Sequence, residues 1–384
     1  MLDAIEKMFK WFKKNKKRRV IDVAYEKAIE VVNQCSTKYG LYASGGWNGY
    51  KGVWSRDSNI TLIGASTEKN DLFKEQWKKS LDILKKYQSH LGQIPNAVLN
   101  LSKKKKQADF KSIDSNMWFI IGHYIYKKRY RDASLFKKHR HAIRKALRWL
   151  YYRDFGENVE LEQLPTSDWQ DAFPHKYGAT INTQALYYAV LNLVGDKNRM
   201  KKLKNVVNKS PEDRLWNKTF YWAYRWKNHN KYKEIGEWFD SLGNLMAIIF
   251  GLADKKMSVS ILDYIKRHRI DEPYPVKCIA PPIKPSSEYW EDYYYDARAT
   301  PNHYLNGGIW PFIGGFYVVA LVKLGRIEEA QIELEKLARS NIRSHLFPEW
   351  INPKNKNTFG KLQAWSAGAY IWAYNAVRKK DILL

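Results

Sequence analysis

The sequence predicts an all-α protein built as a ring of helical hairpins. Apolar residues recur at helical rather than alternating spacing along almost the whole of the 384 residues. About a dozen such stretches leave roughly 32 residues for each helix with its loop, and no convincing series of strands separates them. No strong internal repeat is visible, so the ring is inferred from the number and even pacing of the helices.

The expected helices follow one another at positions where apolar residues recur every three or four residues. Longer helices are expected at 20–35, 71–88, 115–127, 133–152, 181–194, 239–252, 309–324, 327–340 and 363–377. Shorter helices are expected at 57–66, 211–216 and 259–268.

The chain is expected to form one domain, 20–384, after a basic N-terminal segment, 1–19. No linker rich in Pro, Gly or Ser divides it. The densest proline cluster, 273–285, continues into a run of aromatic residues that ends at Tyr295. This segment is too aromatic for a disordered linker, and we expect a long ordered loop of the kind that carries function.

Composition argues against several classes of protein. Cys35 and Cys278 are too few for a disulfide framework, and no cluster of Cys and His has the spacing of metal ligands. No run approaches the ~20 apolar residues of a membrane span, and the N-terminus lacks the apolar core of a signal peptide. We therefore expect a cytoplasmic protein that needs no metal or cofactor.

The net charge of +27 raises the question of a polyanionic partner. The lysines are spread along the whole chain, and only 13–19 and 103–106 are dense. A solvated lysine-rich surface, as in heat-adapted proteins, is favoured over nucleic-acid binding. Four apolar residues precede the first run: Met8, Phe9, Trp11 and Phe12. They could make weak contact with a membrane surface, but packing on the body of the protein is favoured. A basic helical toroid that binds anionic polymers or membranes is the non-enzymatic alternative.

Two carboxylates flanked by tryptophan carry the main functional signal. Asp171 follows Trp169, and Glu349 stands between Pro348 and Trp350. Cleavage of a glycosidic bond needs one carboxylic acid to protonate the leaving oxygen and a second carboxylate as base or nucleophile. A neighbouring tryptophan supplies a flat wall for a sugar ring and raises the pKa of the carboxyl by desolvation. The pair therefore predicts a sugar-cleaving enzyme.

Other roles for these carboxylates stay open. Asp168 is the second candidate for the acid, but Asp171 is favoured. Asp171 is unsuited to cap a helix because the next helix begins about ten residues later. A buried ion pair is the alternative for Glu349. Glu288 is the next candidate if either assignment fails.

Further residues have the chemistry to bind a sugar. Arg56 and Asp57 offer a donor and an acceptor for vicinal hydroxyls, although an ordinary ion pair at a helix start is the alternative. Asp114 and Trp118 are further candidates, but Asp114 before Ser115 is also a good helix cap.

Trp310 and Trp365 both lie at expected helix starts with apolar neighbours. Tryptophans in such positions are more often core than sugar platforms.

Four segments, in order, resemble motifs of known glycosidases. Segment 42–58, with Trp54, Arg56 and Asp57, resembles the first sugar-pocket motif of glycogen-debranching and glucoamylase-like enzymes. Segment 169–172, with 182–187 after it, resembles their general-acid loop and the next helix. Segment 306–311 resembles a loop shared with the neutral and alkaline invertases. Glu349 with Trp350, then Gly360 and 363–368, resembles the catalytic-base segment and the last barrel helix.

The resemblance covers about residues 20 to 380 and implies an (α/α)6 barrel of six helical hairpins. It also implies an inverting mechanism with Asp171 as acid and Glu349 as base. The chain differs from debranching enzymes in having no transferase domain or β-sandwich, and from invertases in lacking an arginine-rich acid loop. The expected sugar contacts are Trp54, Arg56, Asp57, Asp114, Trp118, Trp169, Gln184, Asn306, Gly307, Trp310, Trp350, Gln363 and Trp365.

The expected function is inverting hydrolysis that releases a terminal sugar, with glucose favoured, from an α-linked oligosaccharide or glucan, as an amylo-α-1,6-glucosidase does. Sucrose hydrolysis, as in the neutral invertases, is the enzymatic alternative. The sequence leaves open the linkage, the sugar and the oligomeric state.

Overall fold

The computed structural model describes residues 19–46, 49–68, 70–173, 175–229, 232–343, 346–380 and 382. Within them, an inner ring of helices closes on itself: each inner helix contacts the next, and the last contacts the first. The inner helices are α3 (Ser55–Ala65), α5 (Asp114–Tyr130), α7 (Ile181–Val194), α9 (Ser241–Phe250), α12 (Pro311–Lys323) and α14 (Ala364–Lys379).

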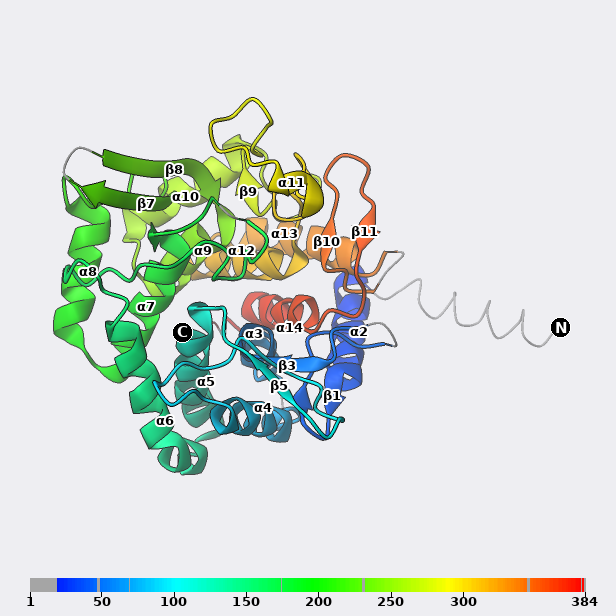
Figure 1. Ribbon diagram of the computed structural model, residues 1–384. Coiled ribbons are helices and arrows are strands. Elements are labelled where there is room, and N and C mark those ends of the chain that lie inside the picture. The colour runs from blue at the N-terminus through cyan, green and yellow to red at the C-terminus, as the bar shows by residue number, and fades with distance from the viewer. Residues whose placement is uncertain are drawn as a thin grey trace, which may run out of the picture.

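A second ring of helices surrounds the first. Its members are α2 (Val20–Cys35), α4 (Lys74–Lys86), α6 (Ser134–Tyr151), α8 (Lys197–Lys209), α10 (Lys255–Arg267) and α13 (Ile327–Asn341). Figure 1 shows α2, α4, α6 and α8 around the outside, with α3 and α14 near the centre. Outer and inner helices alternate along the chain, so the prediction of an α/α-barrel type of fold is confirmed.

The two rings differ in their pattern of burial. Every residue of α3 is buried, as is every residue of α12 except Lys323. By contrast, α4 buries only Trp77, Ser80, Leu81 and Leu84, which recur at the spacing of one helix face. An apolar helix without a polar face belongs in the interior, and an amphipathic helix covers it. Local sequence thus separates inner helices from outer ones.

Glycines let two inner helices lie against each other. A Cβ on Gly64 of α3 would lie 2.0 Å from the carbonyl oxygen of Gly368 in α14, and a Cβ on Gly368 would lie 2.4 Å from the Cα of Thr61. Side chains at these positions would push the helices apart, which a packed core resists. The first and last inner helices therefore close the ring through backbone contact.

Short antiparallel strands connect the helices, so the prediction of an all-α chain is wrong in that respect. The largest sheet has the order β6 (Ala179–Thr180), β7 (Trp222–His229), β8 (Tyr232–Asp240) and β9 (Ile279–Ala280). A second sheet joins β3 (Gly52–Trp54), β4 (Ala97–Leu99) and β5 (Gln107–Asp109). The pairs β1 (Ser36–Thr37) with β2 (Gly40–Leu41), and β10 (Trp350–Ile351) with β11 (Thr358–Phe359), complete the described strands.

One helix prediction in the middle of the chain is wrong, and the start of another is two residues too early. Residues 211–216 form no helix, and the helix in this region is α8. It was missed because few of its residues are apolar and most of the others are lysine or asparagine. The helix expected from 239 begins at Ser241, where the Asp240 side chain accepts a hydrogen bond from the Gly243 N–H. Phe239 itself pairs with Trp222 in the β7–β8 hairpin.

The loop between β9 and α12 is ordered, as expected, and contains the short helix α11 (Tyr293–Asp296). By contrast, Met8, Phe9, Trp11 and Phe12 and the lysine run before Arg19 lie outside the described residues, so the expectations for the N-terminal segment and the domain boundary stay predictions. Of the helices that are described, none is both long and apolar enough to cross a membrane. Nor do the described His, Cys, Asp and Glu side chains gather in threes around a possible metal position.

Candidate active site

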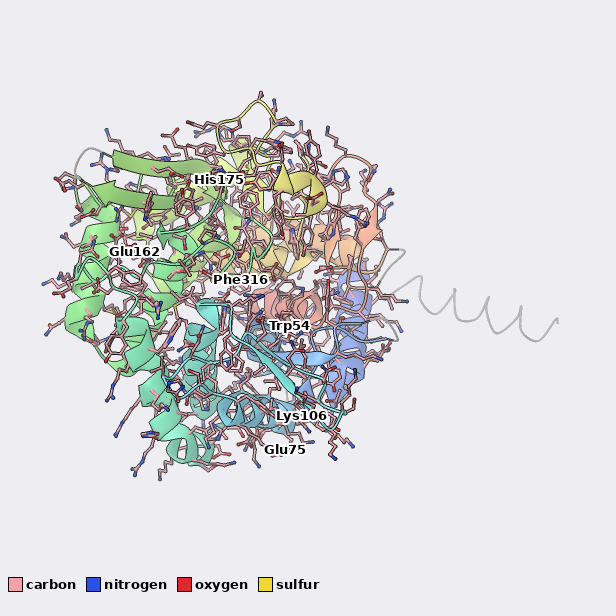
Figure 2. The ribbon with its side chains drawn as sticks, viewed as in Figure 1. Trp54, Glu75, Lys106, Glu162, His175 and Phe316 are labelled. Atoms are coloured by element: carbon pink, nitrogen blue, oxygen red, sulfur yellow. The ribbon has the colours of Figure 1, made fainter. Side chains whose placement is uncertain are left out.

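One pocket of about 190 Å³ lies where the chain enters three inner helices, α3, α12 and α14. Both predicted catalytic carboxylates line it, together with seven of the predicted sugar contacts. Figure 2 labels Trp54, which lies near the centre of the molecule. The lining residues are Ala43, Tyr50, Trp54, Arg56, Asp57, Trp169, Asp171, Tyr304, Trp310, Glu349, Gln363 and Trp365.

Asp171 reaches the pocket from the loop between α6 and α7. Nearby, Trp169 is buried and packs edge-to-face against Trp310 and Phe312, with ring centroids 5.4 Å apart in both pairs. Burial raises the pKa of Asp171, and the charge of Arg56 only partly opposes this. A carboxyl group with a raised pKa is suited to donate a proton.

Glu349 lies at the start of the β10–β11 hairpin, which several contacts hold in place. The Glu349 N–H donates to the Phe359 carbonyl at 2.8 Å, and the Ser366 hydroxyl donates to the Pro348 carbonyl at 3.0 Å. Gly360 has a φ of +65°, and a Cβ there would lie 2.7 Å from the Glu349 Cβ. The glycine in this motif therefore makes room for the glutamate.

The surroundings of Glu349 favour its neutral form. Burial raises its pKa to about 7, and the charges of Asp57 and Asp171 add to the rise. The Tyr50 hydroxyl lies 3.4 Å from Glu349 Oε1 as a hydrogen-bond donor and acts in the opposite direction. The three carboxylates of the pocket are thus electrostatically linked, and removal of one changes the titration of the others.

Arg56 and Asp57 lie side by side in the pocket, but Asp114 does not line it. Arg56 Nη1 donates to both oxygens of Asp114, at 3.0 and 2.8 Å, and both side chains are buried. The Ser112 hydroxyl also donates to Asp114. Asp114 makes no side-chain helix cap. The prediction of a sugar contact at Asp114 is corrected: this residue holds the guanidinium in position.

Asp168 belongs to a buried ion cluster that sequence reasoning missed. Lys176 Nζ lies 2.9 Å from Asp168 and 2.5 Å from Asp240, and all three side chains are at most 1% exposed. Lys176 also donates to Gln170 at 2.6 Å. The cluster ties the acid loop to the start of α9. No local spacing signals it, because its members come from a loop and a distant strand. Glu288 is exposed and outside the pocket.

Three other predicted sugar contacts have structural partners instead. The Trp118 side chain is buried beside a small internal void between inner helices. Gln184 exchanges two hydrogen bonds with the Leu161 backbone, and Asn306 bonds the Ile283 backbone in the same way. The polar groups of Gln184 and Asn306 are occupied by backbone partners, so these two side chains support loops, while Trp118 belongs to the core.

Gly307 and Trp350 also lie outside the pocket lining. Gly307 has a φ of +90° and turns the chain against Pro282. Trp350 stacks on Phe359 with ring centroids 4.0 Å apart, behind the base loop. Both predictions of direct sugar contact are therefore corrected.

Ala43, Tyr50 and Tyr304 line the pocket but were not predicted. Tyr50 lies four residues before Trp54, and Tyr304 lies two residues before the motif at 306–311, so proximity to motifs was the available signal. The Tyr304 carbonyl accepts a hydrogen bond from Trp310 Nε1 at 3.1 Å. The indole N–H groups of Trp54, Trp169 and Trp365, in contrast, are buried without a hydrogen-bond partner among the described residues. A ligand rich in hydroxyl groups would satisfy such donors.

Comparison with known families bears on the C-terminal part of this site. A family model described as alkaline and neutral invertase matches residues 234–379. The matched part contains Glu349 and the segments 306–311 and 363–368. It does not contain Asp171 or Arg56.

Individual relatives match over a similar stretch. Alkaline/neutral invertase E, chloroplastic, of Arabidopsis thaliana is 34% identical over 142 residues, which cover 35% of this chain and 22% of that protein. Neutral/alkaline invertase 1, mitochondrial, of Oryza sativa subsp. japonica is 32% identical over 140 residues, again 35% and 22%. The matched segment spans less than a quarter of these relatives. Because they are named for chloroplasts and mitochondria, the prediction of a cytoplasmic location is wrong on this comparison.

Solved structures share the fold over most of the chain. The GH63 mannosylglycerate hydrolase from Thermus thermophilus, in complex with Tris and D-glycerate, superposes with a TM-score of 0.68 at 14% identity, covering 91% of this chain and 99% of that one. A rhamnosidase from Klebsiella oxytoca with rhamnose bound gives 0.67 at 12% identity, covering 94% and 64%. These structures confirm the fold, and together with the invertase match they confirm the resemblance to the (α/α)6-barrel glycoside hydrolases.

Proposed function

We propose that this protein is an inverting glycoside hydrolase that releases one terminal sugar. The observation that carries the proposal is the position of Asp171 and Glu349 in one pocket with aromatic walls. Asp171 protonates the glycosidic oxygen, and Glu349 takes a proton from a water that attacks the opposite face of the sugar. This mechanism requires the two carboxyl groups to lie ~6.5–9.5 Å apart, with room for that water.

The pocket suits a single sugar ring. At about 190 Å³ it is smaller than the ~300–1,000 Å³ of pockets that hold drug-sized ligands. Tryptophan rings provide flat apolar walls, while Arg56 and Asp57 offer a donor and an acceptor for neighbouring hydroxyls. These features favour removal of one terminal residue over cleavage within a long chain.

The proposed substrate is an α-linked glucoside, and two candidates differ in the group that leaves. Release of glucose from the end of an α-glucan, as in amylo-α-1,6-glucosidase, follows from the motif at 53–57 and the acid loop. Sucrose hydrolysis is supported by the match of residues 234–379 to the invertase model. Both reactions release a glucosyl group from an α linkage, so one pocket and one pair of carboxylates serve either candidate.

Substrate and stereochemistry are tested together by incubation with maltose, isomaltose, panose, sucrose, trehalose and glucosylglycerate. Proton NMR follows the released sugar. An inverting enzyme releases the transferred glucosyl group first as β-glucose. This is decided with sucrose and glucosylglycerate, whose leaving groups are not glucose; α-glucose as the first product from either would overturn the inverting mechanism.

Glu349→Gln should abolish release, while Glu335→Gln on the outer helix α13 is the matched control, because Glu335 is 51% exposed and remote from the pocket lining. No release from any member of the panel would count against the proposal for this substrate class.

The non-enzymatic alternative, a basic toroid for anionic polymers, predicts a different dependence on salt. Binding through neutralised phosphates weakens steeply between about 50 and 200 mM salt, in the range typical of nucleic-acid binding. Turnover of a neutral sugar should change little over the same range.

A further inference from the structure

A second cavity, of about 510 Å³, lies on the other side of the acid loop and shares no lining residue with the active-site pocket. It is bounded by residues 110–113, the end of α6, the loop 162–167 and residues 177–178 with Trp226 of β7. Figure 2 labels Glu162 at this cavity, displaced from Trp54 toward α7 and α8. None of the proposed catalytic steps uses these residues.

The walls combine aromatic rings with charged groups of both signs. Phe110, Trp149 and Trp226 contribute rings, and the Arg153 guanidinium lies over the Trp149 ring at 4.5 Å. Arg153 Nε is buried, and no residue that the structure describes forms a hydrogen bond with it. Across the described part of the chain, neither Arg153 nor the Glu162 carboxylate has an oppositely charged group within ion-pair distance. Two half-buried charges thus face the cavity with unused hydrogen-bonding capacity.

These walls discriminate between classes of ligand. A purely apolar ligand would leave Arg153 and Glu162 without partners, and such groups are costly to bury. An inorganic anion suits Arg153 and the exposed Lys111 at the rim, but it would face the carboxylate of Glu162. A pyranose ring has apolar faces for the aromatic rings and hydroxyls that donate to Glu162 and accept from Arg153. We propose that this cavity is a second carbohydrate-binding site that takes a pyranose ring.

The cavity and the active-site pocket are separated by a common wall but have different lining residues. Ser112 lines the cavity, and its hydroxyl donates to Asp114, which holds Arg56 in the pocket. The Ile113 N–H donates to the Ser167 carbonyl at 2.8 Å, which joins this wall to the acid loop. Substitution of Asp171 should therefore leave the cavity intact, and substitution of Glu162 should leave the catalytic carboxylates intact.

The test measures sugar binding by isothermal titration calorimetry in an Asp171→Asn background, where sugars are not consumed. Maltose, sucrose, glucose, glucose 6-phosphate and inorganic phosphate are titrated in turn. Glu162→Gln and, separately, Arg153→Gln should each weaken one class of sugar site at least tenfold, because each removes a hydrogen bond to a charged group. Glu157→Gln, an exposed carboxylate just before this segment, is the matched control and should bind as the background does.

The outcomes separate this proposal from the hydrolase proposal. Unchanged sugar binding in both variants, or no binding of any sugar, overturns the second site whether or not the wild type hydrolyses glycosides. Inorganic phosphate that binds as tightly as glucose 6-phosphate, and is lost with Arg153→Gln, overturns the pyranose assignment. Thermal unfolding of each variant within a few degrees of the background excludes loss of fold as the cause.

Discussion

Glu349→Gln should make the protein more stable at alkaline pH while abolishing its activity. Burial raises the pKa of Glu349 from the ordinary 4.5 to about 7, so the folded state holds a proton that the unfolded chain releases more readily. The stabilising effect of that protonation is fully present below pH ~4.5 and is lost as the pH rises through about 7. At about 1.4 kcal/mol per pKa unit, the loss reaches at most about 3 kcal/mol. Glutamine does not titrate and escapes this loss.

The effect is measured as the difference in melting temperature between Glu349→Gln and wild type at pH 5 and at pH 8.5. Between these pH values the wild type should lose about 2–3 kcal/mol that the variant keeps. With an unfolding entropy of about 2.1 cal/mol/K per residue, this corresponds to about 3 °C for a chain of this length. Changes that do not depend on pH, such as the altered contact with Tyr50, cancel in the comparison.

Glu335→Gln is the control, because its exposed carboxylate should show a shift below about 1 °C between the two pH values. A difference for Glu349→Gln that stays constant with pH would refute the raised pKa of this carboxyl. A difference that grows toward acid pH would reverse the sign and refute the reasoning altogether.

Asp171→Asn should slow cleavage of natural glycosides by ~10²–10⁴-fold. An aryl or fluoride leaving group needs no protonation and should partly restore the rate, so equal losses on both kinds of substrate would exclude Asp171 as the acid. In wild type, kcat/KM should rise with pH through about 7 as Glu349 ionises. Asp57→Asn removes a neighbouring negative charge and should move this rise to lower pH, and kcat/KM measured over a pH series checks both expectations. Lys176→Met leaves two buried aspartates without their cation and should cost ~3–5 kcal/mol in denaturant unfolding. Glutamine at Lys103–Lys106 should leave turnover of a neutral substrate within a few-fold, because residues 103–105 are exposed in the β4–β5 loop.

Helical periodicity predicted most of the barrel because burial acts on local sequence. The limits of α2 and α7 match the expected 20–35 and 181–194. The β7–β8 hairpin escaped notice although Trp222, Tyr224 and Trp226 recur at strand spacing. Helix α8 escaped because it covers the barrel with few apolar residues. The hairpin signal was present in the local pattern, whereas α8 depends on its packing against the barrel.

The candidate site likewise contains some residues that the sequence could assign and others that it could not. Residues that lie next to one another in a motif, such as Trp54, Arg56 and Asp57, could be assigned to a pocket because one strand-to-helix junction, from β3 into α3, carries them together. The partner of Arg56 is Asp114, 58 residues away, and no local pattern indicates that pairing. Tyr304, likewise, reaches the pocket only because its loop folds over it.

The sequence by itself determined most of the helices of the barrel, and which two carboxylates are candidates for catalysis, since both follow from residue types and their spacing. Only the tertiary structure decided that Asp171 and Glu349 line one pocket, that Asp168 is neutralised by Lys176, and that a second aromatic cavity lies behind the acid loop. Each of these depends on contacts between segments far apart in the chain. Such contacts arise from closure of the helical ring, which brings distant loops together and buries their charges.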